Sequence, residues 1–518
     1  MDSPASGALG ARVRRWRAIL PSARTLAWLV AIGAVAGYYQ FLLHEERNAA
    51  DRRTFALSRL NRSEKTKGSP SDLDITTTSC ELCHHSPHRR MCEYGLDNIR
   101  LSRAYEGSGA RLRKVLARGE QGHAINVGVL GASVTAGHGL APGSPRWHEH
   151  FFSDFQQLFR NARMHVGAAG GVNSHFLSYC HQEFMPREAP IDLYLVEVDI
   201  NNEPTVETMI HDDNLMRSLL DQPHEPAVIR VSVLQVMFDD LARGTMSSLL
   251  VSQYFDVPVI GIRNFLLPHV QHHRRDAELV FGHAGPNTDY RHISDPVHIA
   301  LGDVVSLFIR KEMCELQRRA ALSTAESLKT GPWPDGSDLG RIPPLHVMIF
   351  AFATDHKQNA QWRNPVPVHP PNSSCRMVYS HDPLAPLSHS DEFSLIEWNG
   401  KKAWSSSTPG AEIRFSVHGR NVGVILWATN GQSTPEERSG DAEVRKREAP
   451  GMANCWIEDG DGLDPGAQYA ARSFTSFPSE EYALITRLFS PDSVLACRVS
   501  DKTTSGGHKW RIQGVIGL

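Results

Sequence analysis

The chain carries little excess charge of either sign. Its 518 residues include 54 Lys and Arg against 57 Asp and Glu, a formal net charge of −3 at pH 7. Proteins that bind nucleic acid need a strong basic field to attract the phosphates, so this composition excludes a nucleic-acid partner from our expectations. The glycine-rich segments lack the spacing of a phosphate-binding loop, and no metal, nucleotide or flavin motif stands out. We therefore expect no metal and no cofactor.

Long apolar runs are scarce, and the clearest one lies near the N-terminus at residues 26–43. As a helix it would span about 27 Å, close to the roughly 30 Å of a bilayer core. The arginines that precede it favour the cytosolic side of a membrane. We expect a cytosolic tail over 1–25, a transmembrane anchor over 26–43, and a single-pass type II protein of the secretory pathway, in the Golgi or at the cell surface. The catalytic part would then be luminal or extracellular.

Two other interpretations of the N-terminus stay open. The segment Ala34-Val-Ala36 resembles a signal-peptidase site, which would remove the anchor, and an arginine-rich start also suits an organellar presequence. Residues 44–95 are polar and charged, as in a stem, and include the glycosylation sequon Asn61-Arg-Ser63; a second sequon begins at Asn372.

Cysteines are few, eight in all, and three of them lie close together at Cys80, Cys83 and Cys92. The sequence C-x-x-C-H at 80–84 is compatible with haem attachment or with zinc. In an oxidising compartment the more ordinary outcome is disulfides. The only specific pair we predict is Cys455 with Cys497, because each lies in a strand-like run of the same C-terminal domain.

Strand-like and helix-like patterns alternate over residues 96–320. Five apolar runs rich in β-branched residues predict strands near 126–130, 164–166, 192–200, 227–234 and 257–264. Amphipathic stretches predict helices at 145–161 and 298–318. Repeated β-α units imply a parallel sheet covered by helices, with the active-site loops at the C-terminal ends of the strands.

One serine, Ser133, lies at the small-residue turn that follows the first of these strands. A serine becomes a nucleophile when a base takes its proton, and the base needs a group to orient it. The segment Asp295-Pro-Val-His298 offers both, so we predict a triad of Ser133, His298 and Asp295.

Four segments resemble the conserved blocks of the SGNH (GDSL-type) hydrolases: residues 131–135, 167–171, 196–202 and 295–298. The resemblance implies a flavodoxin-like three-layer α/β fold built on a parallel sheet. It also implies an oxyanion hole formed by the Ser133 and Gly171 backbone amides and the Asn201 side chain. The chain departs from the family at Ala132, where an acidic residue is usual, and at Asn202, where aspartate is usual.

Each of these residues also has a plainer interpretation. Ser133 suits a helix cap, and Gly171 and Asn201 suit turns. The two carboxylates Asp199 and Asp295 suggest a glycosidase as a weaker alternative.

The C-terminal third has a different pattern. A proline-rich linker covers 321–370, and residues 371–518 contain short strands with a period of two, which predicts an antiparallel β-sandwich. Five tryptophans in this part would suit either a sugar-binding platform or the core: Trp398, Trp404, Trp427, Trp456 and Trp510.

These features together predict a membrane-anchored serine esterase that hydrolyses acyl esters, O-acetyl groups on glycans above all. Its partners would be an acylated glycan or a small ester, and the membrane. The same triad can pass the acyl group to a sugar, so a polysaccharide O-acetyltransferase is the alternative. A glycan-binding protein that has lost catalysis is a third possibility.

Overall fold

The computed structural model describes residues 80–322 and 374–517 with gaps. The gaps in the first range are 82, 84–88, 238–244 and 285–286, and the longest in the second are 428–448, 459–467, 471–484 and 487–492. The predicted tail, the anchor at 26–43, most of the stem and linker, and both sequon asparagines therefore lie outside the described residues. Among the helices that are described, none is both long and apolar enough to cross a bilayer.

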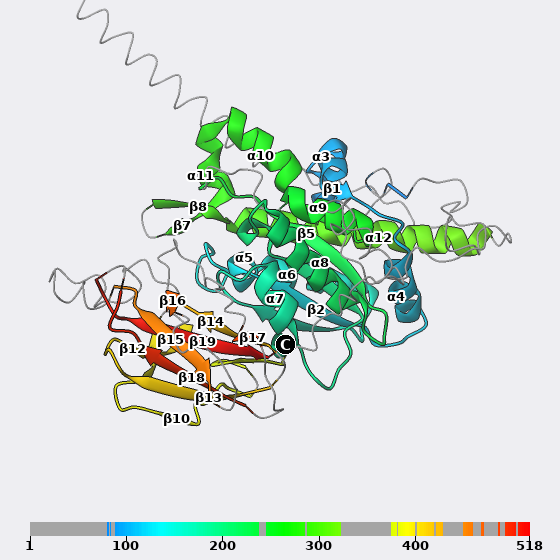
Figure 1. Cartoon of the computed structure of the whole chain (residues 1–518). Coiled ribbons are helices and arrows are strands. Elements are labelled where there is room, and N and C mark those ends of the chain that lie inside the picture. The colour runs from blue at the N-terminus through cyan, green and yellow to red at the C-terminus, as the bar shows by residue number, and fades with distance from the viewer. Residues whose placement is uncertain are drawn as a thin grey trace, which may run out of the picture. The chain divides into compact units, whose positions relative to one another are not determined.

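A six-stranded sheet organises the first part of the chain (Figure 1). Its strand order is β1-β6-β5-β4-β2-β3. Five strands run parallel, and β1 pairs with β6 in the antiparallel direction. The predicted parallel strands are confirmed, whereas β1 was not predicted because three residues at an edge leave no periodic pattern. The strands are β1 (Arg103–Tyr105), β2 (Asn126–Gly131), β3 (Arg163–Ala168), β4 (Leu193–Glu197), β5 (Ala227–Ser232) and β6 (Val259–Gly261).

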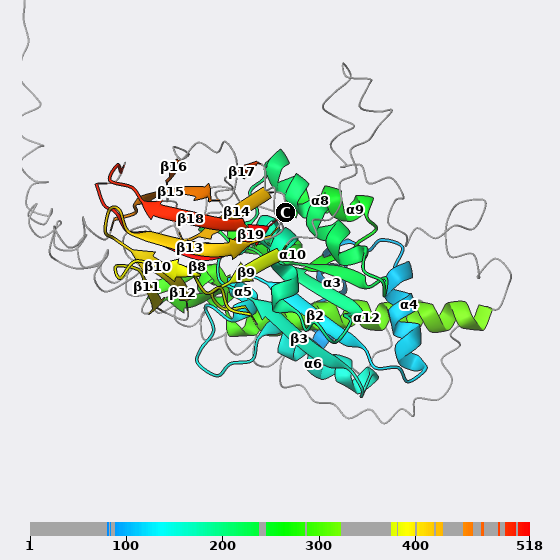
Figure 2. The same ribbon diagram turned by 60° about the horizontal axis from the view of Figure 1, so that its bottom comes forward.

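Helices pack on both faces of this sheet because alternate strand residues point to opposite sides. Val127 and Val129 of β2 belong to one apolar cluster and Leu130 to another. The first cluster includes buried residues of α4 (Ala110–Glu120), α6 (Trp147–Leu158) and α12 (Asp295–Leu322). The second includes residues of α7 (Ser174–Cys180), α8 (Val206–Leu220) and α9 (Thr245–Tyr254). Figure 2 shows α8 and α9 on one side of the strands and α6 on the other.

Shorter elements complete this part. They are α2 (Arg89–Cys92), α3 (Leu96–Leu101), α5 (Ser133–Ala136), α10 (Arg263–His272), α11 (Ala277–Val280) and the 3₁₀ helices η2 (His181–Phe184), η3 (Asp199–Asn201) and η4 (Arg274–Asp276). A hairpin of β7 (Phe281–Ala284) and β8 (Asn287–Ile293) precedes α12. The predicted strand at 257–264 is three residues long in the structure, and the helix α10 takes over at Arg263.

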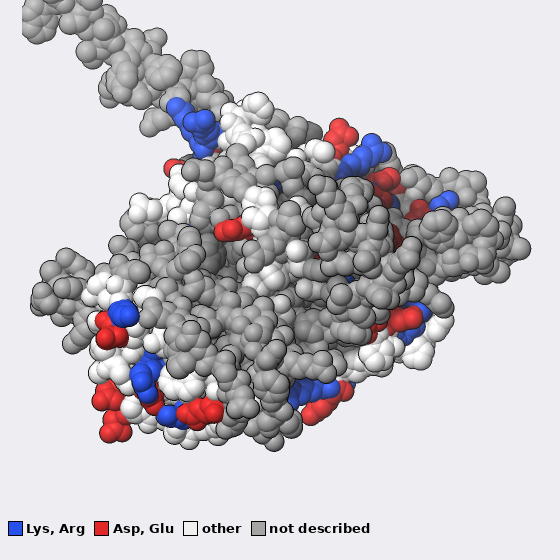
Figure 3. Space-filling view, viewed as in Figure 1, with Lys and Arg blue, Asp and Glu red and all other residues white. Residues whose placement is uncertain are grey.

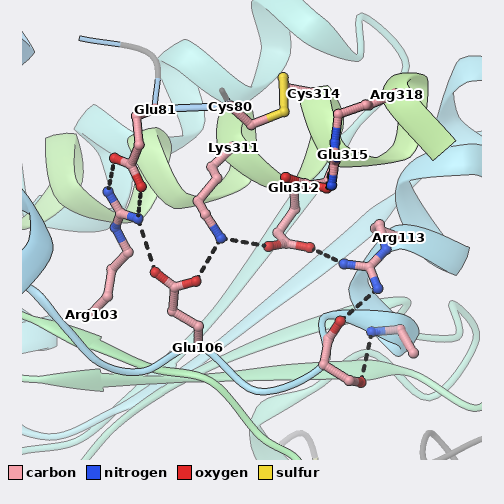
Figure 4. A network of polar contacts seen from close by, with 12 residues as sticks. Cys80, Glu81, Arg103, Glu106, Arg113, Lys311, Glu312, Cys314, Glu315 and Arg318 are labelled. Atoms are coloured by element: carbon pink, nitrogen blue, oxygen red, sulfur yellow. Dashed lines mark hydrogen bonds and ion pairs between the residues drawn. A yellow bond between two sulfur atoms is a disulfide. The ribbon is translucent and has the colours of Figure 1, made fainter. Parts of the chain in front are cut away.

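The segment before β1 is fastened to α12, so the folded domain begins before the predicted boundary at residue 96. Cys80 forms a disulfide with Cys314 of α12. Met91 of α2 lies in an apolar cluster with Leu307 of α12. A chain of alternating charges runs beside the disulfide (Figure 4): Glu81, Arg103, Glu106, Lys311, Glu312 and Arg113.

The C-terminal part forms two antiparallel sheets, in the orders β10-β13-β18-β15-β16 and β11-β12-β19-β14-β17, with β9 paired to β19. Buried residues of both sheets share one apolar cluster. The strands are β9 (Ser374–Met377), β10 (Ser388–His389), β11 (Ser394–Trp398), β12 (Lys401–Ser406), β13 (Glu412–Val417), β14 (Asn421–Leu426), β15 (Met452–Ile457), β16 (Gln468–Ala470), β17 (Ile485–Thr486), β18 (Ser493–Val499) and β19 (Trp510–Gly517).

The tryptophans of this part mostly serve its core. Trp398, Trp427 and Trp510 are buried. Trp404 packs against the shared cluster, and its indole N–H donates to the Leu384 carbonyl. Trp456 is half-buried, with the Arg498 guanidinium over its ring. Four of the five residues proposed for a sugar platform therefore pack inward, because a small two-sheet core needs large side chains to fill it.

All eight cysteines are paired. The predicted pair Cys455–Cys497 is confirmed, and it joins directly opposed residues of β15 and β18. Cys83 pairs with Cys92, so neither sulfur of the C-x-x-C-H segment is available as a thiolate ligand. Cys180 of α7 pairs with Cys375 of β9, which ties the C-terminal part covalently to the first.

Charges on the surface are mixed. On the face drawn in Figure 3, most of the coloured acidic and basic side chains lie beside one another. This agrees with the small net charge of the whole chain, −3.

Candidate active site

Ser133 lies at the C-terminal edge of the sheet, where the sequence predicted it. It follows β2 by two residues and begins the short helix α5. A β-carbon on Gly131 would lie 2.1 Å from Thr135 Oγ1, so the turn needs a glycine at this position. Only 5% of Ser133 is exposed.

The imidazole that contacts this serine belongs to His292 of β8. Its Nε2 lies 2.8 Å from Ser133 Oγ, and its Nδ1 lies 2.5 Å from Asp289 Oδ2. A carboxylate accepts hydrogen bonds, so it holds the ring proton on Nδ1 and leaves Nε2 free to accept from the serine hydroxyl. The three side chains thus form the hydrogen-bonded series of a nucleophile, a base and an orienting acid.

Asp289 is held in its charged form. Burial alone would raise the pKa of this carboxyl, but hydrogen bonds from the His292 ring and the Arg291 backbone N–H bring the pKa below its usual value. A carboxylate that remains charged can stabilise an imidazolium at its side.

The predicted base, His298, does not contact the serine in the structure, which brings His292 there instead. His298 Nδ1 accepts from the Trp147 backbone N–H at 3.1 Å, and its ring is fully buried. Burial lowers the pKa of His298 to about 3, which makes it a weak proton acceptor.

The predicted acid, Asp295, is also engaged elsewhere. It accepts from the Ala141 backbone N–H at 3.3 Å and from the Ser144 hydroxyl. Asp295 and His298 occupy the first turn of α12, where side chains three residues apart share one helix face. That face meets residues 141–147 and not Ser133.

A second D-x-x-H segment was the signal that sequence reasoning missed. Asp289-Tyr-Arg-His292 has the same spacing as Asp295-Pro-Val-His298 and precedes it by six residues. The hairpin explains the choice between them, because it carries Asp289 and His292 to Ser133 before the chain enters α12.

Two of the three predicted oxyanion residues, Gly171 and Asn201, lie close to each other. Gly171 has a left-handed φ of 86°, which favours glycine. The Asn201 amide Nδ2 donates to the carbonyl of the next residue, Val172, at 2.7 Å. Since an amide nitrogen carries two hydrogens, one remains for a ligand. The loop that contains Gly171 is tied to the serine strand by a bond from Ala169 N to Gly131 O at 3.1 Å.

A buried ion-pair network lies behind Asn201. The fully buried Arg230 of β5 contacts Asp199 at 2.8 Å and Asp212 of α8 at 2.6 Å. Asn202 donates to the Ser174 hydroxyl, which in turn donates to Asp212. Asp199 is therefore an ion-pair partner and not the acid of a glycosidase. Asn201 lies in the chain between Asp199 and Asn202, and these contacts hold both of them in place.

Glu197, at the end of β4, accepts hydrogen bonds from the turn that carries Ser133. The Thr135 backbone N–H and hydroxyl donate to one carboxyl oxygen of Glu197 at 3.1 and 2.8 Å, and the Trp147 indole N–H donates to that hydroxyl. Glu197 is fully buried, and burial raises its pKa to about 8. An acidic group thus braces this turn although Ala132 replaces the usual acidic residue.

Replacing Glu197 with glutamine should flatten the pH dependence of stability. The pKa of Glu197 is about 8 in the folded protein, and its ordinary value, which applies in the unfolded chain, is 4.5. The wild type therefore loses stability as the pH rises from about 4.5 to 8. Glutamine does not titrate, so the variant should gain about 2–4 kcal/mol over the wild type between pH 5 and pH 8. Urea unfolding at several pH values measures this gain. Parallel curves for the two proteins would show that Glu197 does not titrate in this window.

Comparisons with known proteins support the fold. No model of a known protein family matches the chain, and no curated protein matches it. Among solved structures, a two-domain esterase active on acetylated mannans matches with a TM-score of 0.55 and 16% identity, over 81% of this chain and 98% of the esterase. A two-domain esterase of the same name, co-crystallized with mannopentaose, matches with a TM-score of 0.54 and 17% identity, over 81% of this chain and 97% of the esterase. This likeness supports the fold of the described residues, an α/β part followed by an antiparallel β part.

Proposed function

We propose that this chain is a serine esterase of the SGNH type that removes O-acetyl groups from a glycan. The observation that carries the proposal is the hydrogen-bonded series of Ser133, His292 and Asp289 at the edge of the sheet. The three-layer arrangement of helices around a largely parallel sheet supports the flavodoxin-like form of that family.

The geometry supports a two-step reaction. Ser133 Oγ attacks the acetyl carbonyl carbon while its proton passes to His292 Nε2, and Asp289 stabilises the imidazolium. The developing oxyanion accepts from the backbone amides of Ser133 and Gly171 and from the Asn201 side chain. His292 then gives its proton to the departing sugar oxygen, which leaves an acetyl-serine. His292 then takes a proton from a water, which attacks this ester; His292 returns that proton to Ser133 Oγ as the ester bond breaks and acetate leaves.

The substrate class comes from the similar structures and from the second domain. The matched two-domain esterases act on acetylated mannans, so an acetylated polysaccharide of that kind is the substrate we propose. The two antiparallel sheets of the C-terminal part, which we take to be a β-sandwich, would be the second domain beside the catalytic one. The described residues offer no cluster of three or more side chains suited to a metal ion.

The proposed location is the lumen of the secretory pathway or the cell surface. All eight cysteines form disulfides, which persist in oxidising compartments. The N-terminal residues 1–25, 26–43 and 44–79 would then be a tail, an anchor and a stem.

Acetate release tests this proposal. The full chain in detergent is incubated with acetylated mannan, beside Ser133→Ala and beside Ser390→Ala as a matched control in the other domain. Acetate release by the wild type and the control but not by Ser133→Ala is the expected result, together with fluorophosphonate labelling of Ser133. Acetate that appears on an added acceptor sugar would make the protein a transferase. A folded wild type that neither reacts with the probe nor releases acetate would contradict catalysis and leave glycan binding.

A further inference from the structure

A short loop after α5 passes directly beside the proposed base. Gly137 and Gly139 both have left-handed φ angles, 90° and 85°, and they flank His138. A β-carbon on Gly139 would lie 2.7 Å from the β-carbon of His292, and one on Gly282 would lie 2.1 Å from the Gly139 carbonyl oxygen. The loop therefore has a fixed path between α5 and the β7–β8 hairpin, and His138 is its one side chain.

The His138 ring borders two parts of the site. Its centroid lies 5.3 Å from that of the His292 ring, with the ring planes at 70°. A β-carbon on Gly170, the residue before Gly171, would lie 3.1 Å from His138 Cε1. The ring thus lies between the base and the loop expected to hold the oxyanion. Unlike Ser133 and His292, which are buried, His138 is exposed.

We propose that His138 contacts the sugar and makes the enzyme prefer glycan esters over simple esters. This inference rests on the proposed esterase function. The departing oxygen must approach His292 Nε2 to receive its proton, so the sugar attached to it passes the ring that lies against His292. A neutral imidazole offers one N–H donor and one nitrogen acceptor. A ring nitrogen of His138 that faces the sugar would bond a hydroxyl next to the ester, and a small aryl ester has no such hydroxyl.

Two substrates and three variants test the assignment. Rates are measured on an acetylated mannan oligosaccharide and on p-nitrophenyl acetate for the wild type, His138→Ala and His138→Asn. His283→Ala, an exposed histidine on β7, is the matched control. We expect His138→Ala to lower kcat/KM on the oligosaccharide about tenfold, the effect of one neutral hydrogen bond, with p-nitrophenyl acetate changed less than about twofold. His138→Asn, which keeps a donor and an acceptor, should recover part of the loss, and His283→Ala should change neither rate.

Three outcomes would overturn the assignment. An equal loss on both substrates would mean that His138 supports the loop or the base and does not contact the sugar. No loss on either would remove it from the site. If the wild type shows no Ser133-dependent activity on either substrate, the proposed function fails and this inference fails with it. If the wild type is active and His138→Ala has the same ratio of kcat/KM on the two substrates as the wild type, only the His138 assignment is contradicted.

Discussion

Alanine in place of His292 is expected to lower kcat/KM for ester hydrolysis by about 10⁴-fold or more, as much as the loss of Ser133 itself. The residues of such a triad act as a unit, so removing the base removes most of what the nucleophile contributes. The expectation follows from the contacts, since His292 lies 2.8 Å from Ser133 Oγ and is oriented by Asp289. Steady-state kinetics on p-nitrophenyl acetate and on acetylated mannan measures the loss.

His298 is the matched control for this experiment, because it occupies the same position in an identical D-x-x-H spacing. It is fully buried and bonded to the Trp147 backbone. His298→Ala should therefore cost stability, about 1–3 kcal/mol for an unsatisfied donor and a small cavity. Activity of the folded fraction should remain within about tenfold of the wild type. If His298→Ala abolished turnover in a folded protein while His292→Ala did not, the proposed triad would be wrong.

Methionine in place of Arg230 is expected to lower the free energy of unfolding by about 3–5 kcal/mol, the typical cost of removing one partner of a buried ion pair. Arg230, Asp199 and Asp212 are all buried, so the substitution would leave two carboxylates in the interior without their cation. The loss should also reach catalysis, because Asp199 begins the 3₁₀ helix that ends at Asn201. Urea unfolding measures the stability, and kcat on p-nitrophenyl acetate measures the displacement of Asn201.

The exposed pair Lys114–Glu225 provides a control for the Arg230 prediction. Its side chains are 59% and 60% exposed, so Lys114→Met should change stability by less than about 1 kcal/mol. A loss for Arg230→Met as small as that for Lys114→Met would show that the buried network adds little. Restoring stability with Asp199→Asn and Asp212→Asn in the Arg230→Met background would identify the uncompensated carboxylates as the cause.

Much of the fold was predictable because its signals are local. The apolar composition of β2, β4 and β5 predicts that they are strands, and Gly131 and Ser133 mark the turn that follows β2. The period of two identified β13, β15 and β18, and the predicted pairing of Cys455 with Cys497 rested on their positions in two such strand-like runs. Strands β1 and β10, of three and two residues, were missed because so few residues show no periodicity. The β7–β8 hairpin was missed as well.

The site was predictable only in part. The position of Ser133 at the sheet edge follows from one strand and one turn, whereas its partner comes from a segment 159 residues further on. The spacing D-x-x-H occurs twice and cannot distinguish Asp289–His292 from Asp295–His298. Glu197 gave no signal in the sequence. Its role depends on the hydrogen bond from Thr135 on the neighbouring turn, and only the folded structure shows this bond.

By itself, the sequence determined the alternation of strands and helices, the antiparallel pattern of the C-terminal third and the serine at the turn. Only the tertiary structure decided which histidine reaches that serine, which cysteines join distant elements, and that Arg230 pairs with Asp199 and Asp212. The physical reason is the range of the interactions. Backbone periodicity and turn chemistry act over a few residues, whereas the direction of a side chain depends on the packing of segments far apart in the chain.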